Sequence, residues 1–345
     1  MQDINILYQY IRGSKAHGIS TPQSDTDMGG VFLSPMHTLL GLGLDYKDEV
    51  SDDRHDVVYW ELAKFGRLLL KSNPSVLEAL FVDPEFIVVK NPVINQFFDI
   101  RKTFLTKECF NPFGRYAEAQ IRKATGLNKM INQPILERKT PFDFCFITVN
   151  NDTKPVADWL EMNHLREDQI SLAKLNHARD AYAVYLHPGG FCKPNGNDVH
   201  VNSIPKGLTA VATLFFNKDA YTIHCKDYKN QKEWEQKRNP VRYESNLGKS
   251  YDAKNMCECL RLVHTCTEIA KGETFHVNRQ GIDADTLLDI RAHKFEFDEL
   301  MEMCNKAIDE MHFAMDTSTI PDKIDPKLVD DIIKSIRLNN YRDRG

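Results

Sequence analysis

Apolar and polar residues follow two different periods along this chain. Short apolar runs at residues 1–13, 26–33 and 56–60 are typical of β-strands, although the first is also compatible with a short helix. Residues 62–70 place apolar side chains at helical spacing, and Asn73-Pro74 ends that helix before another begins with Ser75 as its expected cap. The first part of the chain therefore predicts strands combined with helices.

Helical periodicity dominates after residue 113. Before that point, helical spacing predicts a helix at 95–105. After it, the same spacing predicts helices at 113–132, 169–186, 254–271, 286–291, 297–315 and 326–339, and Gly272 ends the helix at 254–271. Strand-like fragments occur at 142–149 and 275–279, a Gly/Pro/Asn-rich loop at 189–202, and a helix or strand pair at 209–228. We therefore expect an α+β protein with a mixed sheet and helices in residues 1–112 and a mainly α-helical domain in residues 113–345.

The composition excludes several classes of protein. The 345 residues are 42% hydrophobic and 27% charged, with a formal net charge of −5, so no global basic field attracts nucleic acid, although local basic patches remain compatible with it. No apolar run approaches about eighteen residues, which argues against a membrane span. The first residues lack the basic and apolar regions of a signal peptide, so we expect a cytoplasmic location with reduced cysteines.

The most informative chemistry lies in residues 13–27. Gly13 lets the backbone approach a ligand closely, and Ser14 offers a hydroxyl and an N–H group. Asp25 and Asp27 are two positions apart, so both carboxylates face the same side if they lie on a strand. Since carboxylates together with substrate phosphates commonly hold Mg²⁺, the segment is typical of a phosphate-binding turn beside a metal site.

The fuller segment GSKAHGISTPQSDTDMGGVFL resembles the signature of the DNA polymerase β-like nucleotidyltransferases, in the bacterial and phage branch that includes RNA-repair-associated members. Lys15 and His17 stand where that branch commonly has Arg and Tyr. The segment from Val58 to Phe81 also follows the family pattern, and similarity continues more diffusely through the second half of the chain. The resemblance implies a polymerase β-like catalytic domain at residues 1–112.

The resemblance further implies two Mg²⁺ ions, with Mn²⁺ as an alternative, held by Asp25, Asp27 and a third acid from a neighbouring strand. Asp56 opens a strand-like run and is the best candidate for that acid. It would bind metal and help to deprotonate the attacking hydroxyl. The competing acids are Asp45, Glu49, Asp52, Asp53 and Glu61.

The candidates for nucleotide binding fall into three groups. Gly13, Ser14 and Lys15 would contact the phosphates. Lys64 and Arg67 belong to a basic helical stripe that is compatible either with phosphate contact or with a solvated surface. By resemblance to a family motif, Tyr251, Asp252, Lys254 and Arg261 are candidates on the nucleotide or acceptor side, although Asn255 and Cys257 replace histidines that are frequent in that family helix.

The leading hypothesis is an enzyme that transfers a nucleoside monophosphate from a nucleoside triphosphate. The candidate acceptors are an RNA end, including that of a tRNA, a protein and a small molecule. A catalytically silent nucleotide- or RNA-binding module is the alternative. The absence of a His-x-His cluster argues against a metal-dependent phosphohydrolase. A zinc site at Cys257, Cys259 and His264 is a further, weaker hypothesis.

Overall fold

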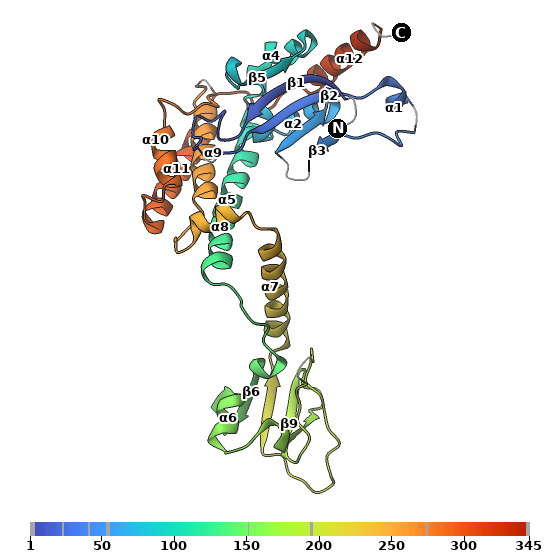
Figure 1. Cartoon of the computed structure of the whole chain (residues 1–345), viewed down its shortest axis with the longest axis vertical. Helices are drawn as coiled ribbons and strands as arrows, with labels where there is room; N and C mark the ends of the chain where they lie inside the picture. The colour runs from blue at the N-terminus through green and yellow to red at the C-terminus, as the bar shows by residue number, and fades with distance from the viewer. Residues whose placement is uncertain are drawn as a thin grey trace. The chain divides into compact units, whose positions relative to one another are not determined.

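The chain folds into two compact units. A computed structural model describes residues 4–22, 24–40, 42–52, 56–150, 152–193, 196–273 and 275–342 (Figure 1). The first unit comprises residues 1–128 and 248–345, and the second unit comprises residues 129–247. The expected boundary at 112/113 instead falls within a helix, α5 (Phe110–Asn132).

The first unit is built on a mixed sheet with the strand order β3-β4-β2-β1-β5. Strands β2 and β4 run parallel, whereas every other adjacent pair is antiparallel. The strands are β1 (Asn5–Arg12), β2 (Asp27–Leu33), β3 (Glu49–Ser51), β4 (Val57–Glu61) and β5 (Ile87–Lys90). The predicted mixed sheet with helices is therefore confirmed.

Helices from both ends of the sequence complete the first unit. The amphipathic α2 buries Leu62, Phe65 and Leu69 in the core, and α9 packs against α10 and α11. The helices besides α5 are α1 (Met36–Leu40), α2 (Leu62–Leu70), α3 (Pro74–Glu78), α4 (Asn95–Asp99), α9 (Ala253–Ala270), α10 (Ala284–Arg291), α11 (Phe297–Asp316) and α12 (Pro326–Arg342), with 3₁₀ turns at Pro84–Phe86, Pro92–Ile94, Arg101–Phe104 and Lys107–Cys109.

The second unit has a sheet and a core of its own. Its strands are antiparallel throughout, in the order β7-β6-β10-β9-β8. The elements are β6 (Cys145–Val149), β7 (Asp152–Pro155), α6 (Val156–Met162), β8 (Ile170–Lys174), β9 (Ala181–Leu186), β10 (Ala212–Phe216), α7 (Lys218–Lys237) and α8 (Pro240–Asn246), with 3₁₀ turns at Pro141–Phe144 and Glu167–Gln169. This second sheet was not predicted from the sequence.

The helix predicted at 169–186 is wrong, because the segment forms β8 and β9. Leu172 and Val184 are fully buried on these two strands. His177 and Asp180, in the turn between them, have φ angles of 61° and 57°. Those left-handed conformations cannot continue an α-helix. The apolar residues of the two strands, on either side of the turn, happen to fall at helical spacing along the sequence.

Two smaller predictions also differ from the structure. Residues 275–279 form no strand among the described residues. Helix α3 is capped by Asn73, whose side chain accepts a hydrogen bond from the Val76 N–H, and not by Ser75. Residues 14–18 form hydrogen-bonded turns that do not continue into a helix. Within the described ranges, no helix combines the length and apolar character needed to cross a bilayer.

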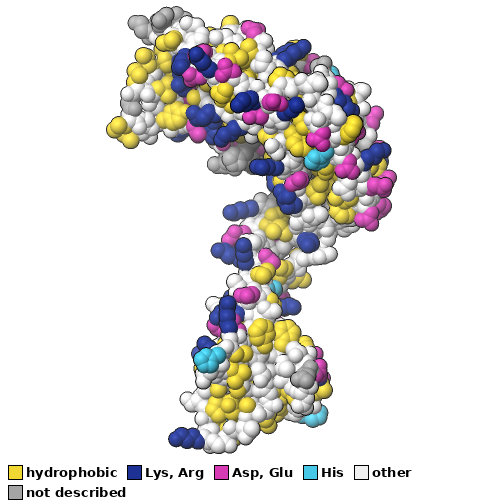
Figure 2. Space-filling model, turned by 180° about the vertical axis from the view of Figure 1, so that it is seen from behind, with side chains coloured by type: hydrophobic (Ala, Val, Ile, Leu, Met, Phe, Trp, Pro, Cys, Tyr) yellow, Lys and Arg dark blue, Asp and Glu magenta, His cyan; other side chains and the backbone are white. Residues whose placement is uncertain are grey.

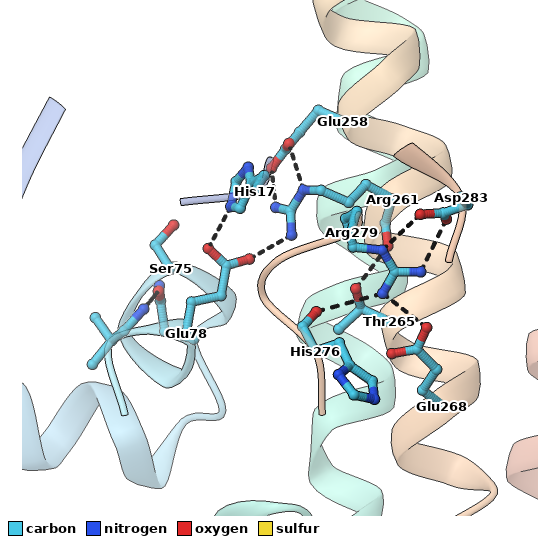
Figure 3. Close-up of polar contacts among 12 residues, drawn as sticks. His17, Ser75, Glu78, Glu258, Arg261, Thr265, Glu268, His276, Arg279 and Asp283 are labelled. Atoms are coloured by element: carbon cyan, nitrogen blue, oxygen red, sulfur yellow. Dashed lines mark hydrogen bonds and ion pairs between the residues drawn. The ribbon is translucent and has the colours of Figure 1, made fainter. Parts of the chain in front are cut away.

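A buried network of charges connects three elements of the first unit (Figure 3). His17, in the turn after β1, lies 3.1 Å from Glu78 at the end of α3. Arg261 of α9 donates to Glu78 at 2.7 Å and to Glu258 at 2.6 and 3.0 Å. We call His17, Glu78, Glu258 and Arg261 the charge network. Burial by itself would raise the pKa of Glu78, but Arg261 and His17 outweigh it and lower that pKa to about 2.

A second group of charges supports the same turn. The Arg279 guanidinium is buried and pairs with Glu268 at 2.8 Å and with Asp283 at 2.7 Å (Figure 3). The Arg279 backbone N–H donates to the His17 carbonyl at 3.0 Å. His264 lies 2.6 Å from Asp283. Burial raises the pKa of Asp283, but hydrogen bonds from His264 and Arg279 outweigh that effect and lower it to about 2.

We predict that Glu78→Gln destabilises the first unit by about 3 kcal/mol, because it leaves part of the Arg261 charge buried without compensation. Calorimetric unfolding of the full chain measures the effect. The exposed Glu85 provides the control, and Glu85→Gln is expected to change stability by less than about 0.5 kcal/mol. Equal stability of the two variants would contradict a stabilising role for the charge network.

The same carboxylate predicts how stability depends on pH. The pKa of Glu78 lies near 2 in the folded chain against an ordinary value of 4.5, so its contribution is present above pH 4.5 and is lost as the pH falls from 4.5 towards 2. We expect Glu78→Gln to lose less stability than the wild type over that interval. Parallel stability profiles of the two proteins from pH 6 to 2 would contradict the assignment.

Candidate active site

The turn after β1 brings the backbone against a carboxylate. Gly13 has a φ of 70°, which favours glycine, and a Cβ atom at this position would lie 2.5 Å from Oδ2 of Asp27. The turn is closed by hydrogen bonds from the His17 N–H to the Gly13 carbonyl and from the Ile19 N–H to the Ser14 carbonyl, both 3.0 Å long. Glycine is therefore required both by the backbone conformation and by the proximity of Asp27.

Parallel pairing of β2 with β4 brings Asp27 and Asp56 to the same edge of the sheet. Met28 is paired with Val57, and the Met28 N–H donates to the Asp56 carbonyl at 2.7 Å. Strand β2 begins at Asp27, so Asp25 lies in the preceding loop, where it is exposed. The strand geometry expected for both members of the Asp-x-Asp pair thus applies to Asp27 alone.

The ionisation of Asp27 reflects these neighbours. Burial raises its pKa most, Arg12 and Lys254 lower it, and the carboxylates of Asp56 and Asp25 raise it again, so that the net shift is upward. Asp25 and Asp56 therefore lie close enough to Asp27 to affect its ionisation. Even so, no three His, Cys, Asp or Glu side chains in the described part of the chain are grouped closely enough to hold a metal ion.

A cavity of about 330 Å³ opens beside this edge of the sheet. Its wall includes Gly13, Ser14 and Asp27 from the predicted motif and Lys254 from α9. The cations that join Lys254 in the wall are Arg12, Lys123 and Arg291. Glu78 and Glu258 also line the cavity, but Arg261 pairs with both of them. The cavity thus offers positive charge near one ionisable carboxylate, an arrangement suited to phosphates.

The positive charge at this cavity is local. Figure 2 shows basic and acidic side chains intermingled over the visible face of the first unit, in agreement with the net charge of −5. The four cations in the cavity wall come from segments that are far apart in the sequence. Attraction of an anionic ligand would therefore depend on this concave site and not on the overall charge of the protein.

Several predicted nucleotide-binding residues lie elsewhere. Lys64 pairs with Asp48 at 3.3 Å and with Glu49 at 3.2 Å, and Arg67 is exposed; neither residue lines the cavity. Lys15 is also outside the wall of the cavity and is hydrogen-bonded to Thr26. In this structure the helical stripe of Lys64 and Arg67 therefore contacts solvent and nearby acids.

The predicted residues around the start of α9 have contacts within the protein. The Tyr251 hydroxyl donates to the Phe295 carbonyl at 3.2 Å, and Asp252 accepts the Asn255 N–H at 2.9 Å as the N-cap of α9. Arg261 is buried in the charge network, beneath the cavity wall. Of these four candidates, Lys254 alone belongs to the cavity wall.

The rival acids also have identified contacts. Asp52 accepts the Val57 N–H at 3.1 Å, Glu49 pairs with Lys64, and Glu61 is fully buried, capping α2 and pairing with Arg337 at 2.9 Å. Asp45 is exposed, and Asp53 lies outside the described residues. Asp56, in contrast to the competing acids that the structure describes, contributes to the raised pKa of Asp27.

The hypothetical zinc ligands do not converge. Cys257 lines the cavity, Cys259 is hydrogen-bonded to Cys304, and His264 pairs with Asp283. As already noted for the described residues, no group of three such side chains could hold a metal. Burial raises the pKa of the Cys257 thiol to about 12, and the hydrogen bond with Cys304 raises the pKa of Cys259, so neither thiol ionises readily.

Sequence reasoning missed Arg12, Glu78, Lys123 and Arg291. Arg12 directly precedes Gly13 at the end of a strand. Its position next to the predicted phosphate-binding turn could have identified it as a candidate. Glu78 interrupts the apolar run VLEALF, so that a buried charge with a partner was predictable there. Lys123 and Arg291 carry no local signal, because they reach the cavity only through the packing of α5 and α10.

Comparisons with known proteins match the N-terminal part of the chain to one family. Residues 1–132, which contain Gly13, Ser14, Asp25, Asp27 and Asp56, match the model of the RNA repair pathway DNA polymerase beta family. The chain is also 23% identical to an uncharacterized 38.9 kDa protein in the nrdC-mobD intergenic region of Enterobacteria phage T4, over 96% of each sequence. No solved structure matches the chain. The resemblance predicted from the Gly-Ser and Asp-x-Asp motifs is therefore confirmed for the N-terminal 132 residues, which match a DNA polymerase β-like family associated with RNA repair.

Proposed function

We propose that this protein is a nucleotidyltransferase that moves a nucleoside monophosphate from a nucleoside triphosphate to an RNA end. The observation that carries the proposal is the cavity that places Asp27, the Gly13-Ser14 turn and four cations together. The name of the matched family supports RNA as the acceptor. A protein side chain or a small molecule are the other acceptors that the experiment below can reveal.

The residues of the cavity have distinct roles in this proposal. The Ser14 hydroxyl and the backbone of the turn hold the phosphates of the donor, and Arg12 and Lys254 balance their charge. The acceptor oxygen forms a bond to the α-phosphorus while the bond to the bridging oxygen of pyrophosphate breaks. Asp56, which lies beside Asp27 at the edge of the sheet but outside the wall of the cavity, accepts the proton of the attacking hydroxyl. Pyrophosphate leaves past the cations of the wall.

The donor chemistry of the carboxylates fits Mg²⁺, with Mn²⁺ as the alternative. Asp25, Asp27 and Asp56 supply hard oxygen ligands. Burial, and then the carboxylates of Asp56 and Asp25, raise the pKa of Asp27, and a bound cation would stabilise its ionised form. A bound metal would neutralise phosphate charge and acidify the acceptor hydroxyl. Since no three acids are grouped closely enough in the described structure, their convergence would accompany binding.

The lack of a close group of three acids among the described residues favours one alternative, a module that binds nucleotide or RNA without catalysis. Such a module would use the same cavity and the same cations but would need no convergence of the three acids. The two functions differ in whether label is transferred. Incubation with each α-³²P-labelled nucleoside triphosphate and Mg²⁺ over a pool of RNA and protein separates them, because a silent module binds the label reversibly and forms no labelled product.

We predict that Asp27→Asn and Asp56→Asn each lower the rate of transfer by roughly 10²–10³. Folding should be unaffected by Asp27→Asn, because burial and the neighbouring carboxylates already disfavour the ionised Asp27. Asp52→Asn is the matched control, since asparagine keeps the acceptor for the Val57 N–H. If Asp56→Asn remains active and Asp52→Asn or Asp53→Asn is inactive, Asp56 is not the third acid. The proposed transfer reaction would still hold, with the other aspartate in that role.

The cations of the cavity predict an effect on substrate binding. Lys254→Gln should raise the KM for the triphosphate about tenfold, because it removes one charged contact to phosphate. Lys64→Gln removes the same charge outside the cavity and should leave KM unchanged. Steady-state kinetics at varied triphosphate measure both. A larger effect of Lys64→Gln would instead support the helical stripe as the phosphate site.

A further inference from the structure

A second cavity, of about 790 Å³, lies in the first unit outside the proposed active site. Its wall comes from residues 81–101, which include β5 and α4, and from the loop 275–282. No residue of this wall takes part in the transfer proposed above. Its size is sufficient for a nucleotide.

One side of this cavity is aromatic. Phe81, Phe98 and Phe275 all belong to its wall. Phe81 meets Phe275 edge to face, with ring centroids 4.7 Å apart at 87°. Phe275 is buried, whereas Phe81 and Phe98 are half-buried and retain surface towards solvent. Partly exposed aromatic rings that line a cavity are surfaces on which a nucleobase can stack.

The same cavity carries two cations, Lys90 and Arg101, and one carboxylate, Asp83, so positive charge is in excess. The Lys90 ammonium lies 3.7 Å from the ring centroid of Phe98, and the Arg101 guanidinium lies 5.5 Å from that of Phe81. Neither cation forms an ion pair with any residue that the structure describes. The acid in the wall, Asp83, instead accepts a hydrogen bond from Asn278 at 3.0 Å. Arg101 also donates a hydrogen bond to the Leu80 carbonyl at 3.4 Å. Aromatic rings beside cations that lack an acidic partner are complementary to a base that carries a phosphate.

A single turn separates this cavity from the active site. Asn278 and Gln280 belong to the wall of the second cavity, and a Cβ atom on Gly18 would overlap Asn278 and lie 2.8 Å from Cγ of Gln280. The residue between them, Arg279, donates its backbone N–H to His17 at 3.0 Å. His17 itself lines the first cavity. A chain bound in the second cavity could therefore extend to the proposed site of transfer.

We propose that the second cavity binds a nucleotide of the RNA acceptor, with its base against Phe81 and Phe98 and its phosphate at Lys90 and Arg101. This proposal rests on the proposed function, because it identifies the acceptor by the part of the strand that is held beside the reacting end. A free nucleoside monophosphate presents the same base and phosphate, and the experiment distinguishes it from a strand.

The test measures binding of a fluorescein-labelled single-stranded RNA of twelve nucleotides to the full-length protein by anisotropy. We expect the double variant Lys90→Gln/Arg101→Gln to weaken RNA binding by about tenfold or more. The slope of log affinity against log salt should fall by roughly 1–2. Lys102→Gln removes an adjacent exposed charge that does not line the cavity, and should bind like the wild type.

Phe98→Leu provides a second variant that retains both charges. Loss of stacking should weaken binding of the RNA roughly tenfold, with an unchanged salt slope. Because Phe98 also packs edge to face on Tyr8 at 5.3 Å, calorimetry must show that the variant remains folded at the temperature of the assay. The charge variant keeps the proposal testable if Phe98→Leu does not fold.

Competition with adenosine monophosphate distinguishes the two sources of the ligand. Displacement of RNA only at millimolar monophosphate supports a strand, and displacement at micromolar concentration supports a free nucleotide in the same cavity. Wild-type affinity for both ligands in the charge variant would overturn the proposal, as would failure of the wild type to bind either. Loss of transfer in Asp27→Asn with intact RNA binding would separate this site from the active site.

Discussion

Glu78 is a carboxylate in the interior of the first unit, and its two partners come from opposite ends of the chain. Its side chain lies between His17 of the turn after β1 and Arg261 of α9. A charge at this depth is tolerated only when it is paired, so the turn, α3 and α9 are restrained to one arrangement. The wall of the candidate active site is built from these elements, and the shape of the cavity therefore depends on this contact.

The second constraint is electrostatic and lies at the edge of the sheet. Parallel pairing of β2 with β4 places Asp27 beside Asp56, where burial and like charge disfavour ionisation of Asp27. Arg12 and Lys254 offset this effect only partly, since the net shift of the pKa is upward. A cavity with this balance favours ligands that bring a cation to the carboxylates and phosphates to the basic residues. A metal–triphosphate complex has both properties.

The two cavities share one structural support. The loop that contains Asn278, Arg279 and Gln280 packs on Gly18 and on the His17 carbonyl, and Arg279 is itself fixed by Glu268 and Asp283. The same turn carries Ser14, which lines the first cavity. A displacement of the loop would therefore also move Ser14. Under the proposed function, an acceptor in the second cavity would lie against the same turn as the phosphates of the donor.

The sequence by itself determined the local features of this protein. Gly13, Ser14 and Asp27 were identified from residue type and spacing, and the strands at 26–33 and 56–60, together with the amphipathic helix at 62–70, from periodicity. Tertiary structure decided the rest. Arg12, Lys123, Lys254 and Arg291 meet at one cavity through the packing of β1, α5, α9 and α10, which no local pattern encodes. The segment 169–186 became two strands because pairing within the second sheet prevailed over an apparent helical period. Local patterns report the neighbours of a residue along the chain, whereas a binding site is made by neighbours in space.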